Sequence, residues 1–315
     1  MKTNTFIFII LLLSILAATF QLVYKSGEID KNNPHSDALI YQEMAQFKNV
    51  FEDTHITYRV FLPAVSGALN KVLNPQQNQL VQNGIFAFLN VLFFSLGMIL
   101  FWRLSFAHRK DNIHFIEVIP VLLVFSIPFF WRGAFLPLVD TISFFLVALI
   151  LWGHLRRSLA LLLFGFIVAI FTKEIIVLIA LFLPLVDWGL KRFWPIGYLM
   201  VLPALLCYGL ILYLNISDLS NFYLLQPGQW ISDWYDTIAT ASWNNFRFLI
   251  SAFGGFVILD FLLLLGKSND RRMWAGAVSL GVLFVLVWLF TPENSPRIMF
   301  MTLPFQFLFV RSLFS

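Results

Sequence analysis

Apolar runs, separated by short polar segments, recur along the whole length of this chain. Of its 315 residues, 59% are hydrophobic and 12% are charged, and several runs approach the roughly 20 residues that cross a bilayer as a helix. A backbone in hydrocarbon must satisfy its own hydrogen bonds, which favours helices. The sequence therefore predicts an all-α, polytopic transmembrane bundle of about ten spans. The expected spans are 5–24, 80–104, 113–130, 141–155, 158–171, 175–188, 194–214, 243–266, 273–290 and 298–310.

We expect one transmembrane domain over residues 1–315, because no internal repeat divides the chain. The first apolar run has an alternative interpretation, since the small residues Ala17, Ala18 and Thr19 are also typical of a cleaved signal peptide. Its apolar core is longer than that of a usual signal, and Phe20 follows at once. We therefore interpret this run as a retained anchor.

Positive charges predict which connections face the cytoplasm. If both termini are cytoplasmic, twelve of the 21 Lys and Arg residues and five of the 17 Asp and Glu residues fall on that side, which makes its net charge +7 and that of the outer side −3. This distribution follows the positive-inside rule. The two longest connections, 25–58 and 215–242, then face outward, and the first continues to residue 79 through an expected interfacial helix at 59–73. We therefore seek the function on the outer face.

The first outer segment, residues 28–63, holds six of the seventeen acids of the chain. A helix that starts at Pro34 would place Ile40 and the apolar residues four, seven and eleven positions later on one face, so we expect it to lie on the membrane surface. Asp37 and Tyr41 fall at the edge of this face, and the first helical turn favours an ionised Asp37. Three polar residues are expected to face water: Gln42, Glu43 and Gln46.

Several outer connections carry charges at the ends of spans that are short for a bilayer. The run 158–171 would be about 21 Å long as a helix, against a hydrocarbon core of roughly 30 Å. The turn after it contains Lys173 and Glu174, and Asp140 precedes another short run, so all three should lie below the outer surface. Charges at that depth need partners or water, and we expect these residues to line an outward-facing cavity. The alternative is that Asp140 caps its helix and Lys173 pairs with Glu174.

Four arginines are expected on the outer side: Arg59, Arg132, Arg247 and Arg297. All but Arg132 lie near predicted helix N-termini, where the helix dipole disfavours a cation unless an anion is near. A carboxylate such as Glu293 would satisfy Arg297. A phosphate would do so as well, because its oxygens match the planar guanidinium group. The occurrence of these arginines on one side favours a phosphate-bearing ligand.

The order of these features resembles that of a known superfamily. An initial transmembrane helix is followed by SDALIYQEMA at 36–45, YRVFLP at 58–63, VD at 139–140, TKE at 172–174 and ENSPR at 293–297. The pattern Asp-x3-Tyr-x3-Ala, followed by Tyr-Arg-x3-Pro, resembles bacterial members of the GT-C superfamily of integral-membrane glycosyltransferases. Each motif is short, but their order covers most of the chain.

The resemblance implies that a sugar passes from a polyprenyl-phosphate donor to a glycan, lipid or protein acceptor, outside the bacterial cytoplasmic (inner) membrane, in the cell envelope. Neither a nucleotide sugar nor nucleic acid is implied. An aspartate of the first outer loop commonly serves as general base in such enzymes, and that position matches Asp37. Arg59, Lys173 and Arg297 would stabilise the departing lipid phosphate. The implied substrate-binding set is Tyr41, Arg59, Asp140, Lys173, Glu174, Glu293 and Arg297.

A divalent cation is the one cofactor that the resemblance leaves open, because the loop aspartate is a metal ligand in some branches. The acids nearest to Asp37, Asp30 and Glu43, are seven and six residues away, which weakens the case for a metal site. We therefore assign no metal ligand.

Three other functions remain as alternatives: a polymerase or ligase of lipid-linked glycans, a non-enzymatic transporter of them, and a non-catalytic assembly partner. A transporter is expected to carry ionisable residues or broken helices near the bilayer midplane. Here the charges lie at helix ends, which favours an enzyme.

Overall fold

The computed structural model describes residues 3–32, 37–46, 59–76, 78–106, 118–125, 127, 139–173, 176, 179–199, 202, 203, 205, 206, 209, 256, 260, 266, 270–290 and 302–313. Every regular element within these residues is a helix. The second outer connection, 215–242, lies outside them, as do parts of several predicted spans.

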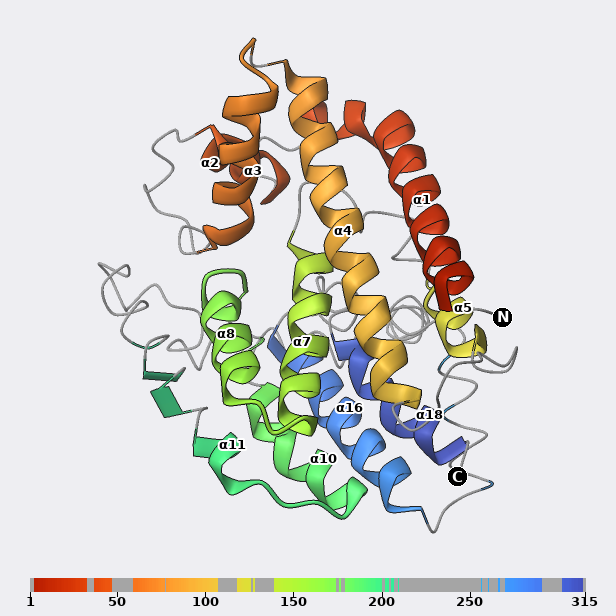
Figure 1. Cartoon of the computed structure of the whole chain (residues 1–315). Coiled ribbons are helices and arrows are strands. Elements are labelled where there is room, and N and C mark those ends of the chain that lie inside the picture. Colours follow the sequence, from red (N-terminus) through yellow and green to blue (C-terminus); the bar gives the residue numbers. More distant parts are fainter. Residues whose placement is uncertain are drawn as a thin grey trace.

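The helices are shown in Figure 1. Their bounds are α1 Thr3–Asn32, α2 Asp37–Ala45, α3 Phe61–Leu73, α4 Gln79–Phe106, α5 Ile119–Phe125, α7 Asp140–Leu155, α8 Leu159–Ile170, η2 Ile179–Phe182, α10 Leu183–Leu190, α11 Pro195–Leu199, α16 Arg271–Phe290, η6 Leu303–Gln306 and α18 Phe307–Leu313. The predicted runs 80–104, 141–155 and 158–171 are confirmed as the helices α4, α7 and α8.

Helix α1 is longer than the predicted first span. It runs from Thr3 to Asn32, so residues 25–32, which were expected in the outer loop, continue the helix. These eight residues contain a single glycine and no proline, so nothing in them forces the helix to end. The first proline after the span is Pro34, and the next described helix begins at Asp37.

Among the described helices, α4 alone is long and apolar enough to cross a membrane. It has 28 residues with a mean hydropathy of 2.3 in its most apolar window, and its length is about 42 Å. The described part of the chain also contains apolar helices of 10–17 residues. Length and composition thus give weak support for a membrane location through one helix, and the ten spans stay a prediction.

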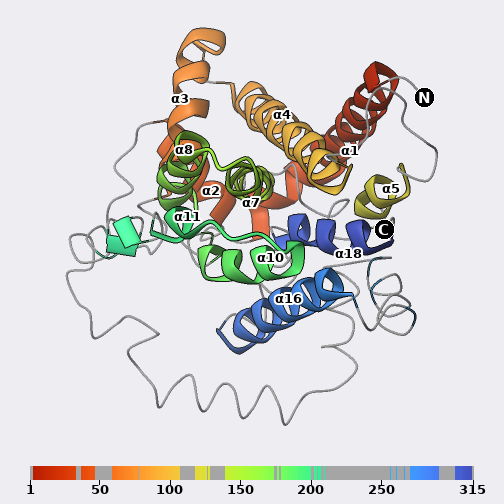
Figure 2. The ribbon, with the colours of Figure 1, turned by 60° about the horizontal axis from the view of Figure 1, so that its bottom comes forward.

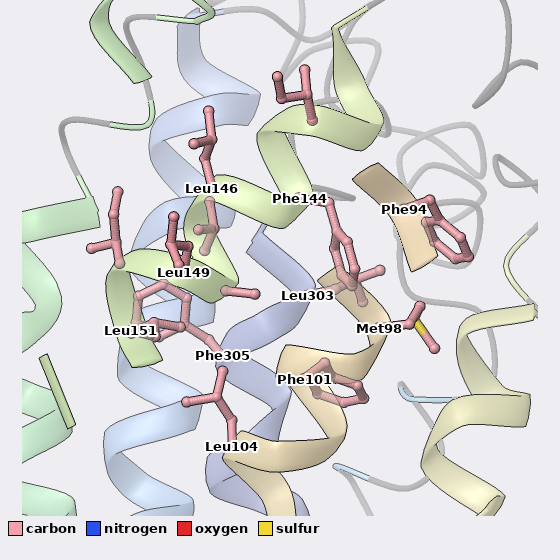
Figure 3. Packing of buried hydrophobic residues seen from close by; sticks show 14 of the residues in the cluster. Phe94, Met98, Phe101, Leu104, Phe144, Leu146, Leu149, Leu151, Leu303 and Phe305 are labelled. Atoms are coloured by element: carbon pink, nitrogen blue, oxygen red, sulfur yellow. The ribbon is translucent and has the colours of Figure 1, made fainter. Parts of the chain in front are cut away.

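Helix α4 contacts α1, α3, α7 and α18, while α7 packs on α8 and α10 on α16 (Figures 1 and 2). The part of the apolar core drawn in Figure 3 lies between α4, α7 and η6. Its side chains recur every three or four residues along α4, at Phe94, Met98, Phe101 and Leu104 (Figure 3). Phe94 stacks on Phe144 of α7 with ring centroids 5.6 Å apart.

Two glycines of α4 give a matched test of this packing. A Cβ atom at Gly97 would lie 2.6 Å from Phe144 Cδ1 and 3.1 Å from the backbone of Phe145, whereas one at Gly84 meets nothing within 4 Å. We expect Gly97→Ala to destabilise the protein by about 1–3 kcal/mol. Gly84→Ala should be neutral or stabilising by about 0.5–1 kcal/mol, because alanine favours a helix. Thermal unfolding in detergent measures both, and equal shifts would contradict the described α4–α7 packing.

The ends of α4, α7, α10, α16 and α18 meet at one end of the structure, at the bottom of Figure 1. Arg192 Nη1 donates to the carbonyl of Leu155 at 3.2 Å, and Arg311 Nε donates to that of Leu104 at 2.6 Å. We call this the basic end. Its described Lys and Arg residues are Arg103, Arg156, Arg157, Lys191, Arg192, Arg271, Arg272 and Arg311.

Asp270 is the carboxylate that joins α16 to α18 at the basic end. Burial by itself would raise its pKa, but hydrogen bonds from Arg272 and Ser312 lower the pKa to about 2. Asp270 therefore stays ionised at neutral pH and offsets part of the positive charge around it.

Candidate functional site

A buried ion pair lies at the opposite end of α7 from the basic end. Lys173 Nζ donates to Asp140 Oδ1 at 3.1 Å, and the two side chains are 6% and 0% exposed. Asp140 is the first residue of α7, where the helix dipole favours an anion. Helices α7 and α8 are antiparallel around a tight turn at 156–158, so the residues just after α8 return to the level of Asp140.

The observed pairing differs from the predicted alternative in which Asp140 only caps its helix. The N-cap residue of α7 is Val139, whose side chain makes no capping hydrogen bond. Asp140, which was the expected cap, is instead the first residue of the helix. Lys173 pairs with Asp140 across 33 positions of sequence. Glu174, the partner in the local alternative, lies outside the described residues. Asp140 and Lys173 therefore pair with each other, and the outward-facing cavity that they were expected to line stays a prediction.

The ion pair is fixed against α4 by its sequence neighbour. Thr141 Oγ1 donates to Asn90 Oδ1 at 2.5 Å, and both residues are fully buried. Asn90 lies 16 residues before the end of α4 at Phe106, which corresponds to about 24 Å along the helix. The pair is thus about 24 Å from the basic end, less than the roughly 30 Å thickness of a hydrocarbon core.

A second polar pair joins α2 to the start of α3. Arg59 Nη1 donates to the phenol oxygen of Tyr41 at 3.5 Å. Tyr41 is fully buried and Arg59 is 8% exposed. Tyr41 was expected at the edge of an apolar face that lies on the membrane surface. In the structure this part of α2 is covered by protein, because α2 packs against α3 and α1.

One backbone hydrogen bond brings the two pairs into the same region. The amide of Phe61 donates to the carbonyl of Phe171 at 3.0 Å. Phe61 is two residues after Arg59, and Phe171 is two residues before Lys173. The described structure therefore brings four predicted site residues into one region, near the ends of α7 and α8 that lie away from the basic end, where two cations and a carboxylate are buried.

The expectation that Gln42 faces water is wrong. Gln42 is 2% exposed and donates through Nε2 to Asn83 Oδ1 at 2.5 Å. Gln46 is half-buried and donates to Gln82 at 2.8 Å, and Glu43 is half-buried. The sequence signal that could have revealed this is the group Gln79, Gln82 and Asn83, because carboxamides at i, i+3 and i+4 form a polar face at the start of an apolar helix.

The remaining predicted site residues are described only in part. Asp37 is the first residue of α2, one helical turn before Tyr41, and its side chain lies outside what the structure describes. Glu174, Glu293 and Arg297 are outside the described residues altogether. Within the described part of the chain, no group of three His, Cys, Asp or Glu residues could hold a metal ion. A divalent cation therefore stays an open hypothesis.

A third polar cluster, which the sequence analysis missed, lies near the basic end. His154 Nε2 is 2.9 Å from Asp187 Oδ1, and the Trp194 amide and the Tyr198 hydroxyl both donate to Asp187 Oδ2. The cluster ties the end of α7 to α10 and α11. With three partners on one buried carboxylate, its evident role is to join these helices.

No family model, curated protein or solved structure matches this chain. The resemblance to the GT-C superfamily therefore depends on the order of the sequence motifs alone.

Proposed function

We propose that the chain is a multi-pass glycosyltransferase of the bacterial cytoplasmic membrane with both termini in the cytoplasm. It takes a sugar from a polyprenyl-phosphate donor on the non-cytoplasmic side. The observation that carries the proposal is the burial of Arg59, Lys173 and Asp140 near the ends of α7 and α8 that lie away from the basic end. Buried cations at this depth suit a lipid phosphate, which brings its own apolar chain.

Each residue has a defined part in the proposed reaction. Asp37 takes the proton of an acceptor hydroxyl while that oxygen attacks the anomeric carbon. The new glycosidic C–O bond forms as the bond to the donor phosphate breaks, and the polyprenyl phosphate leaves with the bonding electrons. Lys173 and Arg59 stabilise this departing phosphate. Arg297, Glu174 and Glu293 remain candidates for substrate contacts.

Packing below the site favours chemistry over transport. Between the level of Asn90 and the basic end, α4 meets α7 through Phe94 and Gly97, and Phe144 fills the space beside Gly97. This part of the described interface is apolar and tight, so a sugar would find no polar surface there on its way to the basic end. A polymerase or ligase of lipid-linked glycans would use the same outer site and stays the nearest alternative.

The proposed orientation predicts opposite labelling of two exposed positions. Gln76 lies in the turn before α4, and Arg156 follows α7 at the basic end. In a Cys207→Ser background, we expect Gln76→Cys to react with a membrane-impermeant maleimide in intact cells. Arg156→Cys should react only after the membrane is opened. The reverse pattern would exclude an outward-facing site.

The function itself is tested with purified protein in lipid nanodiscs. A panel of polyprenyl-phosphate hexoses and pentoses is supplied with a cell-envelope extract as acceptor, and released polyprenyl phosphate is measured. We expect one donor to be consumed. Donor movement across vesicles without cleavage would support a transporter instead, and no consumption of any donor would contradict the proposal.

A further inference from the structure

Carboxamide side chains join α2 to the first turns of α4. Gln42 Nε2 donates to Asn83 Oδ1 at 2.5 Å, and Gln42 Oε1 accepts from Gln79 Nε2 at 2.8 Å. Gln82 Nε2 donates to the backbone carbonyl of Gln42 at 2.8 Å, and Gln46 Nε2 donates to Gln82 Oε1 at 2.8 Å. We call these five residues, Gln42, Gln46, Gln79, Gln82 and Asn83, the amide clamp.

The clamp stabilises α2, which is too short to be a stable helix by itself. Helix α2 has nine residues, fewer than the roughly 12–15 that an isolated helix needs in water. Gln42 is 2% exposed and Gln82 is 1% exposed, so loss of one partner would leave a buried amide unsatisfied. The position of α2 is therefore set by contacts with α4 as well as with α3.

The other end of the clamp is itself fixed. Asn74 Nδ2 donates to Asn70 Oδ1 and to the carbonyl of Asn78, both at 2.8 Å, and the Asn78 amide donates back to Asn74 Oδ1 at 2.8 Å. These bonds hold the turn between α3 and α4. Helices α2, α3 and the start of α4 thus form one connected unit over the Asp140–Lys173 pair.

We propose that the amide clamp positions α2 so that Asp37, its first residue, meets a substrate held by Lys173 and Arg59. This role depends on the proposed glycosyltransferase function, and it makes Gln42 a positioning residue. Direct binding of a sugar hydroxyl by Gln42 is disfavoured, because both polar atoms of its side chain are already used within the clamp.

Two variants separate positioning from general stability. Gln42→Leu removes the side-chain bonds to Asn83 and Gln79, and we expect kcat to fall about 10- to 100-fold while KM for the donor changes less than about 3-fold. Asn83→Asp keeps an acceptor for Gln42 Nε2 near the N-terminus of α4, where the dipole favours an anion. It should stay within about 3-fold of the wild-type kcat.

Gln306→Leu is the matched control. Gln306 is also a fully buried amide, and it donates to Asp260 Oδ2 at 2.7 Å, outside the clamp. Hydrogen exchange of the amides of residues 37–45 is measured in all variants. Faster exchange is expected in Gln42→Leu and not in Gln306→Leu.

The outcomes distinguish the clamp from the reaction. Unchanged exchange in Gln42→Leu would overturn the clamp, whatever the activity. Faster exchange with a wild-type kcat would overturn the positioning role, and so would an equal loss of kcat in Gln306→Leu. If the wild-type protein consumes no donor, the proposed function fails and the positioning role fails with it, whereas the exchange data still report on the clamp alone.

Discussion

Asp37→Asn is expected to lower sugar transfer by about 10²- to 10⁴-fold, the contribution of a general base. Asparagine keeps the size and polarity of the side chain and is favourable at a helix N-terminus, so α2 should still begin at this position. It cannot accept the proton of an acceptor hydroxyl. The loss should therefore appear in kcat, with little change in expression, membrane insertion or donor binding, as measured with purified protein.

Glu43→Gln is the matched control for Asp37→Asn, because it removes a carboxylate from the same helix. Glu43 is the seventh of the nine residues of α2 and is half-buried. We expect this variant to keep activity near that of the wild type. Wild-type transfer by the Asp37 variant would remove the proposed mechanism, and an equal loss in both variants would point to α2 as a whole rather than to one base.

Asp140→Leu is expected to destabilise the protein by about 3–5 kcal/mol, because it leaves the buried ammonium group of Lys173 without this carboxylate. The double variant Asp140→Leu, Lys173→Met replaces both charges with apolar groups and should recover most of that stability. If Lys173 binds the donor phosphate, the double variant folds but has lost transfer. Thermal unfolding and donor consumption measure the two effects separately.

A double variant that is both stable and active would show that the ion pair serves folding only. A single variant Asp140→Leu with wild-type stability would contradict the burial of the pair. Lys173→Met alone adds a further comparison, since it leaves Asp140 buried without this ammonium group and should also be destabilised. These three variants separate the structural role of the pair from its proposed contact with phosphate.

Local signals were sufficient to predict the main helices of the described region. The run predicted at 80–104 became Gln79–Phe106, and 158–171 became Leu159–Ile170, because apolar residues fill these stretches and polar or capping residues such as Ser158 bound them. The side chain of Ser158 accepts a hydrogen bond from the Leu161 amide, which is the expected N-cap geometry. The basic end also follows from sequence, since its charges flank the apolar runs.

Contacts between distant residues could not be predicted in the same way. The apolar periodicity of the segment shows that Gln42 lies on the polar face of its helix. It does not show that another helix packs against that face, so Gln42 was expected to face water. Its partner Asn83 is 41 residues away. Lys173 likewise had a local candidate in Glu174, whereas the structure pairs it with Asp140, 33 residues away. A single sequence carries no direct signal for such pairs.

The short length of α8 has a consequence for lipid access. Its 12 residues span about 18 Å, less than the roughly 30 Å of a hydrocarbon core. Side chains such as Phe164 and Ile167, each 53% exposed, would face the acyl chains. A bilayer adapts to a short apolar helix by thinning around it. Headgroups beside α8 would then lie near the depth of Lys173, so that a lipid phosphate could reach this residue sideways from its own leaflet.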